Sequence, residues 1–317
     1  MKVTTNKKIT VVAVCGPTAS GKSARAEEIA VRLNGTVISC DSMQIYKGMD
    51  IGTAKPTRAD RVRVEYRMID VVEPDRDFSC AEFTKMAAEA ILQTHEKGKL
   101  PVICGGTGLY MDNLLYRTEF SPAGGDDDYR RSLEGFDNGE LHKMLQAVDP
   151  RSAEAIHENN RKRVVRALEI YHLTGKTKSC WDDMSRVKTS DYNVIKIILT
   201  AENREVLYDR INRRVDIMLE NGLVEEAKGI DLEKCKTARQ AIAYKELEGY
   251  LKGEITLSRA AEGLKQATRN YAKRQITWFA RENDGMRLDI SSHTGEEIIA
   301  IGVDYVKEKI REFEMQE

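Results

Sequence analysis

The sequence predicts an α/β protein: a doubly wound parallel sheet that carries a helical insertion domain and ends in C-terminal helices. Short apolar runs rich in β-branched residues alternate with helical stretches along the first part of the chain. This is the pattern of a parallel sheet covered by helices on both faces. After about residue 118 the chain turns helical, and a strand-like run returns only at 192–199. We therefore expect residues 1–118 and 190–317 to form the core and residues 119–189 to form the insertion.

The expected core elements begin near the N-terminus. Ile9–Cys15 is apolar almost throughout, which is typical of a strand buried on both faces. A helix over 23–33 and a second strand over 36–40 follow it. A helix over 83–95 has its apolar residues on one face, and a third strand over 100–104 ends at two glycines.

Helices dominate the rest of the chain. The further expected elements are a Pro/Gly/Asp loop at 121–128, helices within 128–175, a strand at 192–199, an amphipathic helix at 205–220 that ends near Gly222, and a helix at 257–279. Thr256 or Ser258 would cap the last helix, since a hydroxyl side chain accepts hydrogen bonds from the first helical turn.

Composition excludes several classes of protein. The chain has 317 residues, of which 41% are apolar and 32% charged, which indicates a globular protein of about two domains. No apolar run approaches the ~20 residues that cross a bilayer, and residues 1–10 are too polar for a signal peptide. We expect a cytoplasmic protein without a membrane partner.

The six cysteines include no C-x-x-C pair, so the spacing of a zinc site is absent. Cys15, Cys40 and Cys104 end or follow strand-like runs, where free cysteine packs as a small apolar side chain. We expect buried, reduced thiols and a reducing compartment.

Basic residues are unevenly distributed, although the formal net charge is −1. Three segments are basic: Arg161, Lys162, Arg163 and Arg166; Arg210, Arg213 and Arg214; and Lys265, Arg269, Lys273 and Arg274. In the last segment Lys265, Arg269 and Lys273 recur at helical spacing and would form one stripe. Such a stripe can bind a polyanion, but an ordinary solvated helix face has the same pattern.

A glycine-rich segment follows the first strand and fits the phosphate-binding pattern G-x-x-x-x-G-K-[ST]. It consists of Gly16, Pro17, Thr18, Ala19, Ser20, Gly21, Lys22 and Ser23. Its glycines let backbone N–H groups turn toward phosphate oxygens, and the following helix adds the positive end of its dipole. Lys22 supplies a charge, and the Ser23 hydroxyl is placed to bind Mg²⁺, the expected cofactor. The core is therefore of the P-loop type, but ATP and a prenyl diphosphate both suit the loop.

Two further groups follow strands and should lie near the P-loop, because the carboxyl ends of parallel strands face the ligand crevice. Asp41, after the second strand, would be a Mg²⁺ ligand, a general base or a cap of the following turn. Gly105, Gly106 and Thr107 follow the third strand. The glycines would let the backbone approach a ligand, or would only form a tight turn. An ordinary ATPase would have an acidic residue here.

These motifs, together with others, resemble the tRNA dimethylallyltransferase family. The segments that carry the resemblance are GPTASGKS at 16–23, DSMQIYKGMDIGTAKP at 41–56, GGTGLY at 105–110, NRKRVVRALEIYHLTGK at 160–176, RINRRVDIMLENGLVEEA at 210–227, IAYKELEGYLKG at 242–253 and TRNYAKRQITWF at 268–279. They keep the family's order, span most of the chain and are highly specific together. The resemblance implies that the dimethylallyl group of dimethylallyl diphosphate is transferred to N6 of the adenosine next to the anticodon in tRNA, and that diphosphate is released.

The resemblance also implies roles for individual residues. The P-loop with Lys22 would bind the diphosphate, Asp41 would take a proton from the adenine N6 amine, and Thr107 would line the channel where the substrates meet. Either Arg210 or Arg214 would stabilise the leaving diphosphate. The residues expected to contact the anticodon stem-loop of tRNA are Asp41, Ser42, Met43, Gln44, Thr107, Arg130, Lys162, Arg163, Val164, Val165, Arg166, Lys265, Arg269, Lys273 and Arg274. A monomer is expected.

Several alternatives stay open. A P-loop small-molecule kinase would phosphorylate a metabolite without RNA, and a non-catalytic RNA-binding module would bind tRNA without reaction. Ala243 stands where the family commonly has glycine, which leaves the local backbone in question. Trp278 and Phe279 can stack on bases, but we expect them to pack in the core.

Overall fold

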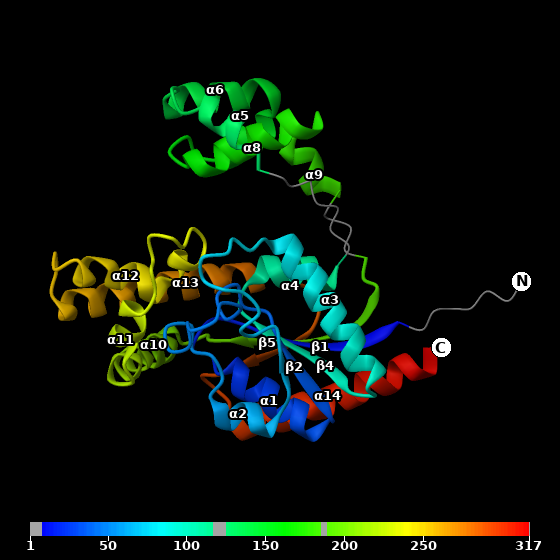
Figure 1. Ribbon diagram of the computed structural model, residues 1–317. Helices are drawn as coiled ribbons and strands as arrows, with labels where there is room; N and C mark the ends of the chain where they lie inside the picture. Colours follow the sequence, from blue (N-terminus) through cyan, green and yellow to red (C-terminus); the bar gives the residue numbers. More distant parts are fainter. Residues whose placement is uncertain (1–7, 117–124, 185–188, 317) are drawn as a thin grey trace, which may run out of the picture. The chain divides into compact units, whose positions relative to one another are not determined.

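The computed structural model describes residues 8–116, 125–184 and 189–316. The chain divides into two units, shown in Figure 1. Met1–Leu115 with Asp191–Glu317 is called here the core unit, and Tyr116–Ser190 the insertion unit. The core unit has the α/β architecture with a parallel sheet that the sequence predicts.

The core unit contains a six-stranded sheet whose paired strands are parallel. Its order is β3 (Tyr66–Arg67), β2 (Gly35–Ser39), β4 (Leu100–Gly105), β1 (Ile9–Cys15), β5 (Tyr192–Thr200) and β6 (Met286–Asp289). β1 lies between β4 and β5 and is buried along most of its length, which explains its apolar sequence. Cys15 pairs with Gly105 of β4, so the turns that follow these two strands leave the sheet side by side.

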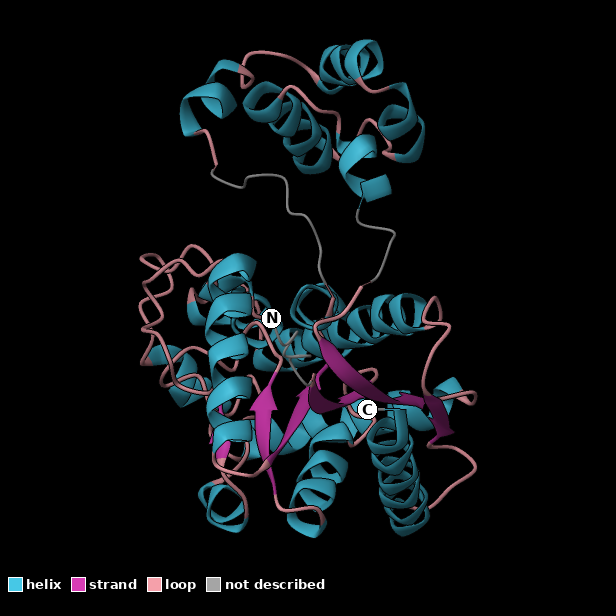
Figure 2. Cartoon of the chain, turned by 90° about the vertical axis from the view of Figure 1, so that its right-hand side faces the viewer, coloured by secondary structure: helices cyan, strands magenta, loops and turns pink. Residues whose placement is uncertain are grey.

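Helices cover both faces of this sheet (Figures 1 and 2). On one face lie α1 (Lys22–Arg32) and α14 (Gly295–Gln316); on the other lie α3 (Cys80–Glu96) and α4 (Gly108–Leu115). The core unit also contains α2 (Arg58–Arg63), α10 (Arg204–Glu220), α11 (Leu223–Lys228), a 3₁₀ helix (Ala238–Gln240), α12 (Ile242–Leu251) and α13 (Leu257–Phe279).

Local capping explains where several helices begin. In the capping box of α3, the Ser79 and Glu82 side chains each accept a hydrogen bond from the other residue's backbone N–H. Thr256 caps α13 by accepting from the Arg259 N–H at 3.3 Å, so the first of the two predicted caps is the one used. β3 and β6 were not predicted, because strands of 2 and 4 residues carry too little periodicity. The helix α14 was also missed.

The insertion unit is helical, as predicted, in its described residues. Its helices are α5 (Asp127–Ser132), α6 (Asn138–Val148), α7 (Pro150–Ala155), α8 (Arg161–Thr174) and α9 (Lys178–Met184). Their buried apolar side chains include Leu133, Leu141, Leu145, Val164 and Leu168. Of the predicted loop at 121–128, residues 121–124 lie outside the described part of the chain, and Asp126 caps α5.

Two expectations from composition bear on the fold. All six cysteines are free, but Cys180 is exposed and Cys80 is half-buried, so the expectation of buried thiols is wrong at these positions. Across residues 8–116, 125–184 and 189–316, no helix combines the length and the apolar character needed to cross a bilayer.

Candidate active site

The P-loop follows β1 and opens α1, which is the context that its sequence pattern requires. Gly16 has a φ of 146°, and a Cβ atom there would lie 2.6 Å from the carbonyl oxygen of Leu199. Gly21 has a φ of 80° and stands at the N-cap of α1. Both positions therefore need glycine, and the loop turns sharply into the N-terminus of the helix, where backbone N–H groups attract anions.

Lys22 and Asp41 line the same polar cavity, whose volume is about 70 Å³, together with Thr18 and Ser23. Burial lowers the pKa of the Lys22 ammonium, and the positive charge of Arg214 adds to this effect, while Asp41 opposes it. The cation and the carboxylate thus line one cavity, as the resemblance found in the sequence implies.

One oxygen of the Asp41 carboxylate caps the turn after β2. Oδ1 accepts hydrogen bonds from the backbone N–H groups of Met43 at 2.9 Å and Gln44 at 3.4 Å. These bonds fix the orientation of the side chain and leave the second oxygen, Oδ2, for a ligand. Of the three roles that the sequence left open, capping is present, and it is compatible with either of the other two.

The two candidate arginines of α10 occupy different surroundings. Arg214 donates from Nη1 to the Thr18 Oγ1 at 3.2 Å and lines the cavity that contains Lys22. Burial lowers the pKa of Arg214, and Asp41 opposes this shift. Arg210 instead lies near Arg25, whose pKa it lowers in addition to the effect of burial. Arg214 is therefore the arginine that faces the P-loop.

A second cavity, of about 240 Å³, shares Thr18, Asp41, Arg214 and Tyr271 with the first. Its apolar lining residues are Met43, Ile211, Val215, Met218, Ala241, Ile242, Ala243 and Leu264. Burial and the nearby Asp41 raise the pKa of Tyr271 to about 12, so its hydroxyl keeps its proton at neutral pH. Ala243 lies in the first turn of the regular helix α12, so alanine needs no unusual backbone there. A polar chamber beside an apolar one suits a phosphate head with a short hydrocarbon tail.

Two of the glycines at and after the end of β4 make room for α13, whereas Gly105 lines the cavity that contains Lys22. A Cβ atom on Gly106 would lie 2.2 Å from Nε2 of Gln275. A Cβ atom on Gly108 would lie 2.2 Å from Cδ1 of Trp278. Phe279 is buried at the end of the same helix. Phe279 therefore packs in the core, as expected, whereas Trp278 is half-buried and packs against Gly108.

Thr107 joins the two loops that follow β2 and β4. Its Oγ1 accepts a hydrogen bond from the Ser42 backbone N–H at 3.4 Å. Next to it, a Cβ atom on Gly105 would lie 2.0 Å from the Cys40 carbonyl oxygen. The structure thus brings Thr107 beside the turn that carries Asp41.

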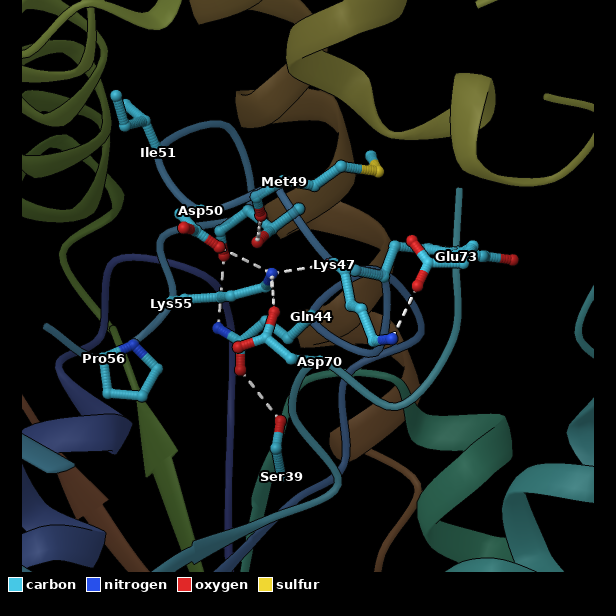
Figure 3. Close-up of polar contacts among 12 residues, drawn as sticks. Ser39, Gln44, Lys47, Met49, Asp50, Ile51, Lys55, Pro56, Asp70 and Glu73 are labelled. Atoms are coloured by element: carbon cyan, nitrogen blue, oxygen red, sulfur yellow. Dashed lines mark hydrogen bonds and ion pairs between the residues drawn. The ribbon is translucent and has the colours of Figure 1, made fainter. Parts of the chain in front are cut away.

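The loop from Asp41 to Pro56 is held by side chains within it and by side chains of neighbouring segments (Figure 3). Gln44 accepts from the Ser39 Oγ at 2.8 Å and donates from Nε2 to the carbonyl oxygens of Thr53 at 3.2 Å and Ala54 at 3.1 Å. Its amide is fully engaged by these contacts. Gln44, which was predicted to contact tRNA, therefore braces the loop through its side chain.

Lys55 is a further organising residue that the sequence analysis missed. Its side chain is 1% exposed, and its Nζ donates to the Tyr46 carbonyl oxygen at 2.5 Å, to Asp50 Oδ1 at 2.7 Å and to Asp70 Oδ1 at 2.6 Å (Figure 3). Asp70 also accepts from Arg61 at 2.8 Å. No local pattern distinguishes Lys55 from an exposed lysine, because its burial depends on how the loop folds back on itself.

The predicted basic stripe of α13 is partly occupied by contacts with α10. Lys265 forms an ion pair with Asp216 at 2.8 Å and is 16% exposed, and Arg269 donates to Asn212 Oδ1 at 2.6 Å. The exposed basic residues of this segment are Lys273 and Arg274. The stripe is therefore not one free surface, since its first half stabilises the packing of two helices.

The predicted RNA contacts of the insertion unit differ in their exposure. Arg130 and Arg166 hold the buried Glu169 carboxylate at 2.7 and 2.5 Å. Val164 is fully buried in the core of this unit, so its side chain serves packing and is not available to RNA. The exposed members of the segment are Lys162 and Arg163, and Val165 is half-buried.

The residues present fit a magnesium ion that binds together with phosphate. The described residues contain no cluster of three or more His, Cys, Asp or Glu side chains that would hold a metal by itself. Ser23 and Asp41 both line the P-loop cavity. Mg²⁺ commonly takes one or two protein ligands and completes its shell with phosphate oxygens and water, so this sparse donor set matches its needs.

Fold and site together define a P-loop protein in which a carboxylate and an arginine lie beside the phosphate-binding motif. The profile of the family described as IPP transferase matches residues 44–282. The tRNA dimethylallyltransferase of Caldanaerobacter subterraneus is 48% identical over 279 residues, which are 86% of this chain and 89% of that protein. The tRNA dimethylallyltransferase of Anoxybacillus flavithermus is 48% identical over 287 residues, 90% of this chain and 91% of that protein.

The fold also matches solved structures of similarly named transferases. The tRNA isopentenylpyrophosphate transferase of Bacillus halodurans superposes with a TM-score of 0.71 at 42% identity, covering 96% of this chain and 99% of that one. A eukaryotic dimethylallyltransferase acting on tRNA superposes with a TM-score of 0.80 at 29% identity, covering 95% of this chain and 80% of that one. The chain belongs to the tRNA dimethylallyltransferase family.

Proposed function

We propose that the protein transfers the dimethylallyl group from dimethylallyl diphosphate to N6 of the adenosine adjacent to the anticodon in tRNA, and releases diphosphate. The observation that carries this proposal is the arrangement of Lys22, Asp41 and Arg214 around one polar cavity with an apolar cavity beside it. The names of the relatives support the same reaction. A kinase is not favoured, because β4 ends in glycine where an ATPase would have an acidic residue.

The reaction breaks the bond between the allylic carbon and the diphosphate oxygen and forms a bond from that carbon to N6. Lys22, Arg214 and the backbone N–H groups of the P-loop would stabilise the charge that develops on the leaving diphosphate. Asp41 would accept the proton that N6 loses. The apolar cavity would hold the five-carbon group and exclude water from the allylic carbon.

Ser23 would supply a protein ligand to Mg²⁺, with phosphate oxygens as the other ligands. When bound, the ion would neutralise part of the diphosphate charge. The six free cysteines support a reducing compartment such as the cytoplasm.

The target adenine must leave its stack to reach Asp41, at a cost of a few kcal/mol. Phosphate contacts elsewhere on the RNA would offset this cost. Lys273 and Arg274 are suited to that role, since both are exposed on α13 and Arg274 lines the second cavity. Lys162 and Arg163 of the insertion unit offer a second set of contacts.

Incubation of the purified protein with Mg²⁺, radiolabelled dimethylallyl diphosphate and tRNA should transfer label to tRNA. A tRNA with guanosine in place of the target adenosine is the control, because it lacks the N6 amine. The proposal is wrong if the folded protein labels neither RNA, or labels both equally.

Replacing both Lys273 and Arg274 by alanine should weaken tRNA binding and lower the slope of log affinity against log salt by about 1–2. Each removed cation eliminates one phosphate contact, so the counterions of that phosphate are no longer released when the RNA binds. The matched control is Lys307→Ala, an exposed lysine on α14, which should leave the slope unchanged. Titrations of tRNA at several salt concentrations measure this. An unchanged slope in the double variant would exclude these residues as RNA contacts.

A further inference from the structure

The side chain of Gln275 on α13 is hydrogen-bonded to the backbone of the P-loop. The residue is 5% exposed, and its Oε1 accepts a hydrogen bond from the Thr18 backbone N–H at 2.7 Å. Its Nε2 donates to the Gly106 carbonyl oxygen at 2.9 Å. Both ends of the amide are therefore fixed, one by the P-loop and one by the turn after β4.

Thr18 is the third residue of the P-loop motif, and its N–H is one of the backbone donors of this loop. Inward N–H groups of such a loop bind phosphate oxygens because each presents a partial positive charge. Here the Gln275 carbonyl oxygen occupies that donor. The Thr18 hydroxyl is engaged as well, since it accepts from Arg214 at 3.2 Å. Thr18 is thus held at its backbone and its side chain by helices from the far end of the chain.

Because the Thr18 N–H already donates to Gln275, the P-loop has one backbone N–H group fewer for a phosphate ligand. Gln275 and the Asp41 carboxylate line the same polar cavity as Lys22. An additional phosphoryl group on this side would bring its oxygens toward an amide oxygen and a carboxylate, and the Thr18 N–H would not be available to bind it. Such unpaired, repulsive contacts discriminate between ligands more effectively than added attraction.

We propose that Gln275 makes this P-loop selective for a diphosphate ester over a triphosphate such as ATP. The inference rests on the proposed function, in which the phosphate ligand is a diphosphate. It gives Gln275 a role in specificity, through the position of its side-chain oxygen, and not in the transfer step itself.

Two variants test the role of Gln275, one by replacing its side chain and one by displacing it. Gln275→Met keeps the volume of the side chain and removes both hydrogen bonds. Gly106→Ala leaves Gln275 intact but places a Cβ atom 2.2 Å from its Nε2, so the flexible end of the glutamine must move away. Thr277→Ala, two residues further along the same helix and exposed, is the matched control.

Isothermal titration with inorganic diphosphate and inorganic triphosphate, in excess Mg²⁺, measures the preference directly. The wild-type protein and Thr277→Ala should prefer diphosphate by about tenfold or more, which is 1.4 kcal/mol or more. In both Gln275→Met and Gly106→Ala the preference should fall to about threefold or less, mainly because triphosphate binds more tightly. Circular dichroism confirms that each variant is folded.

Equal wild-type affinity for the two anions, or an unchanged preference in the folded variants, would overturn the role of Gln275. These results are separable from a failure of the proposed function. A protein that prefers diphosphate but transfers no label to tRNA contradicts the reaction and not the selectivity. If the variants still transfer label to tRNA and keep the wild-type preference for diphosphate over triphosphate, only the role of Gln275 is contradicted.

Discussion

Replacing Asp41 by asparagine should lower the rate of prenyl transfer by about 10²–10⁴-fold, the usual loss when a general base is removed. Diphosphate binding should be retained or become tighter, because the substitution removes a negative charge from the chamber that contains Lys22 and Arg214. Asparagine keeps an Oδ1 acceptor for the Met43 and Gln44 N–H groups, so the turn after β2 should survive. Single-turnover transfer and titration with diphosphate measure the two effects separately.

Asp41→Ala is the companion variant, because it removes the base and the turn cap together. It should be as inactive as Asp41→Asn but less stable, by about 0.5–2 kcal/mol, the usual cost of losing such a cap. Thermal unfolding of both variants measures this difference. If Asp41→Asn transferred at the wild-type rate while Asp41→Ala did not, the carboxylate would serve only to cap the turn, and the proposed base would be wrong.

Lys55→Met should destabilise the core unit by about 2–4 kcal/mol. It should also lower the rate of prenyl transfer, although the hydrogen bonds of Lys55 go to Tyr46, Asp50 and Asp70 and not to the P-loop. The variant leaves the Tyr46 carbonyl oxygen and Asp70 without their shared partner. Asp70 keeps its contact with Arg61, which limits the loss. The loop that presents Asp41 should become less ordered. Urea unfolding and the transfer rate measure the two consequences.

Lys47→Met is the matched control in the same loop (Figure 3). Lys47 pairs with Glu73 at 2.5 Å, but both side chains are exposed, and such surface pairs contribute about 0–1 kcal/mol. The free energy of unfolding should change by no more than about 0.5 kcal/mol. If both lysine variants unfolded at the same urea concentration, burial of Lys55 would not matter to stability.

The Lys55 network also predicts a dependence on pH. Burial of Asp70 raises its pKa, but hydrogen bonds from Lys55 and Arg61 outweigh this and hold the pKa below its usual value. A carboxylate with a lowered folded-state pKa stabilises the protein above its unfolded pKa, which is about 3.9. That contribution is lost as the pH falls below ~4 through the folded-state pKa. The stability of Lys55→Met should therefore fall less steeply than that of the wild type in this range.

Patterns within short segments were sufficient to predict much of the fold and part of the site. The apolar run Ile9–Cys15 and the glycine spacing after it fixed the position of the phosphate loop. The placement of Asp41 near the P-loop followed from its position directly after the second expected strand, since the carboxyl ends of parallel strands share one edge of the sheet. These features depend on local sequence, so a single chain reveals them.

Tertiary contacts between distant segments decided the rest. Arg210 and Arg214 lie one helical turn apart, and only the packing of α10 against the P-loop, 196 residues away in sequence, brings Arg214 to Thr18. Gln275 reaches the same loop from a separation of 257 residues. Lys265 and Lys55 have the sequence context of surface lysines, but an acidic partner from another segment holds each, and Lys55 is fully buried while Lys265 is partly buried. Periodicity and spacing describe one element at a time, whereas these roles arise only where elements meet.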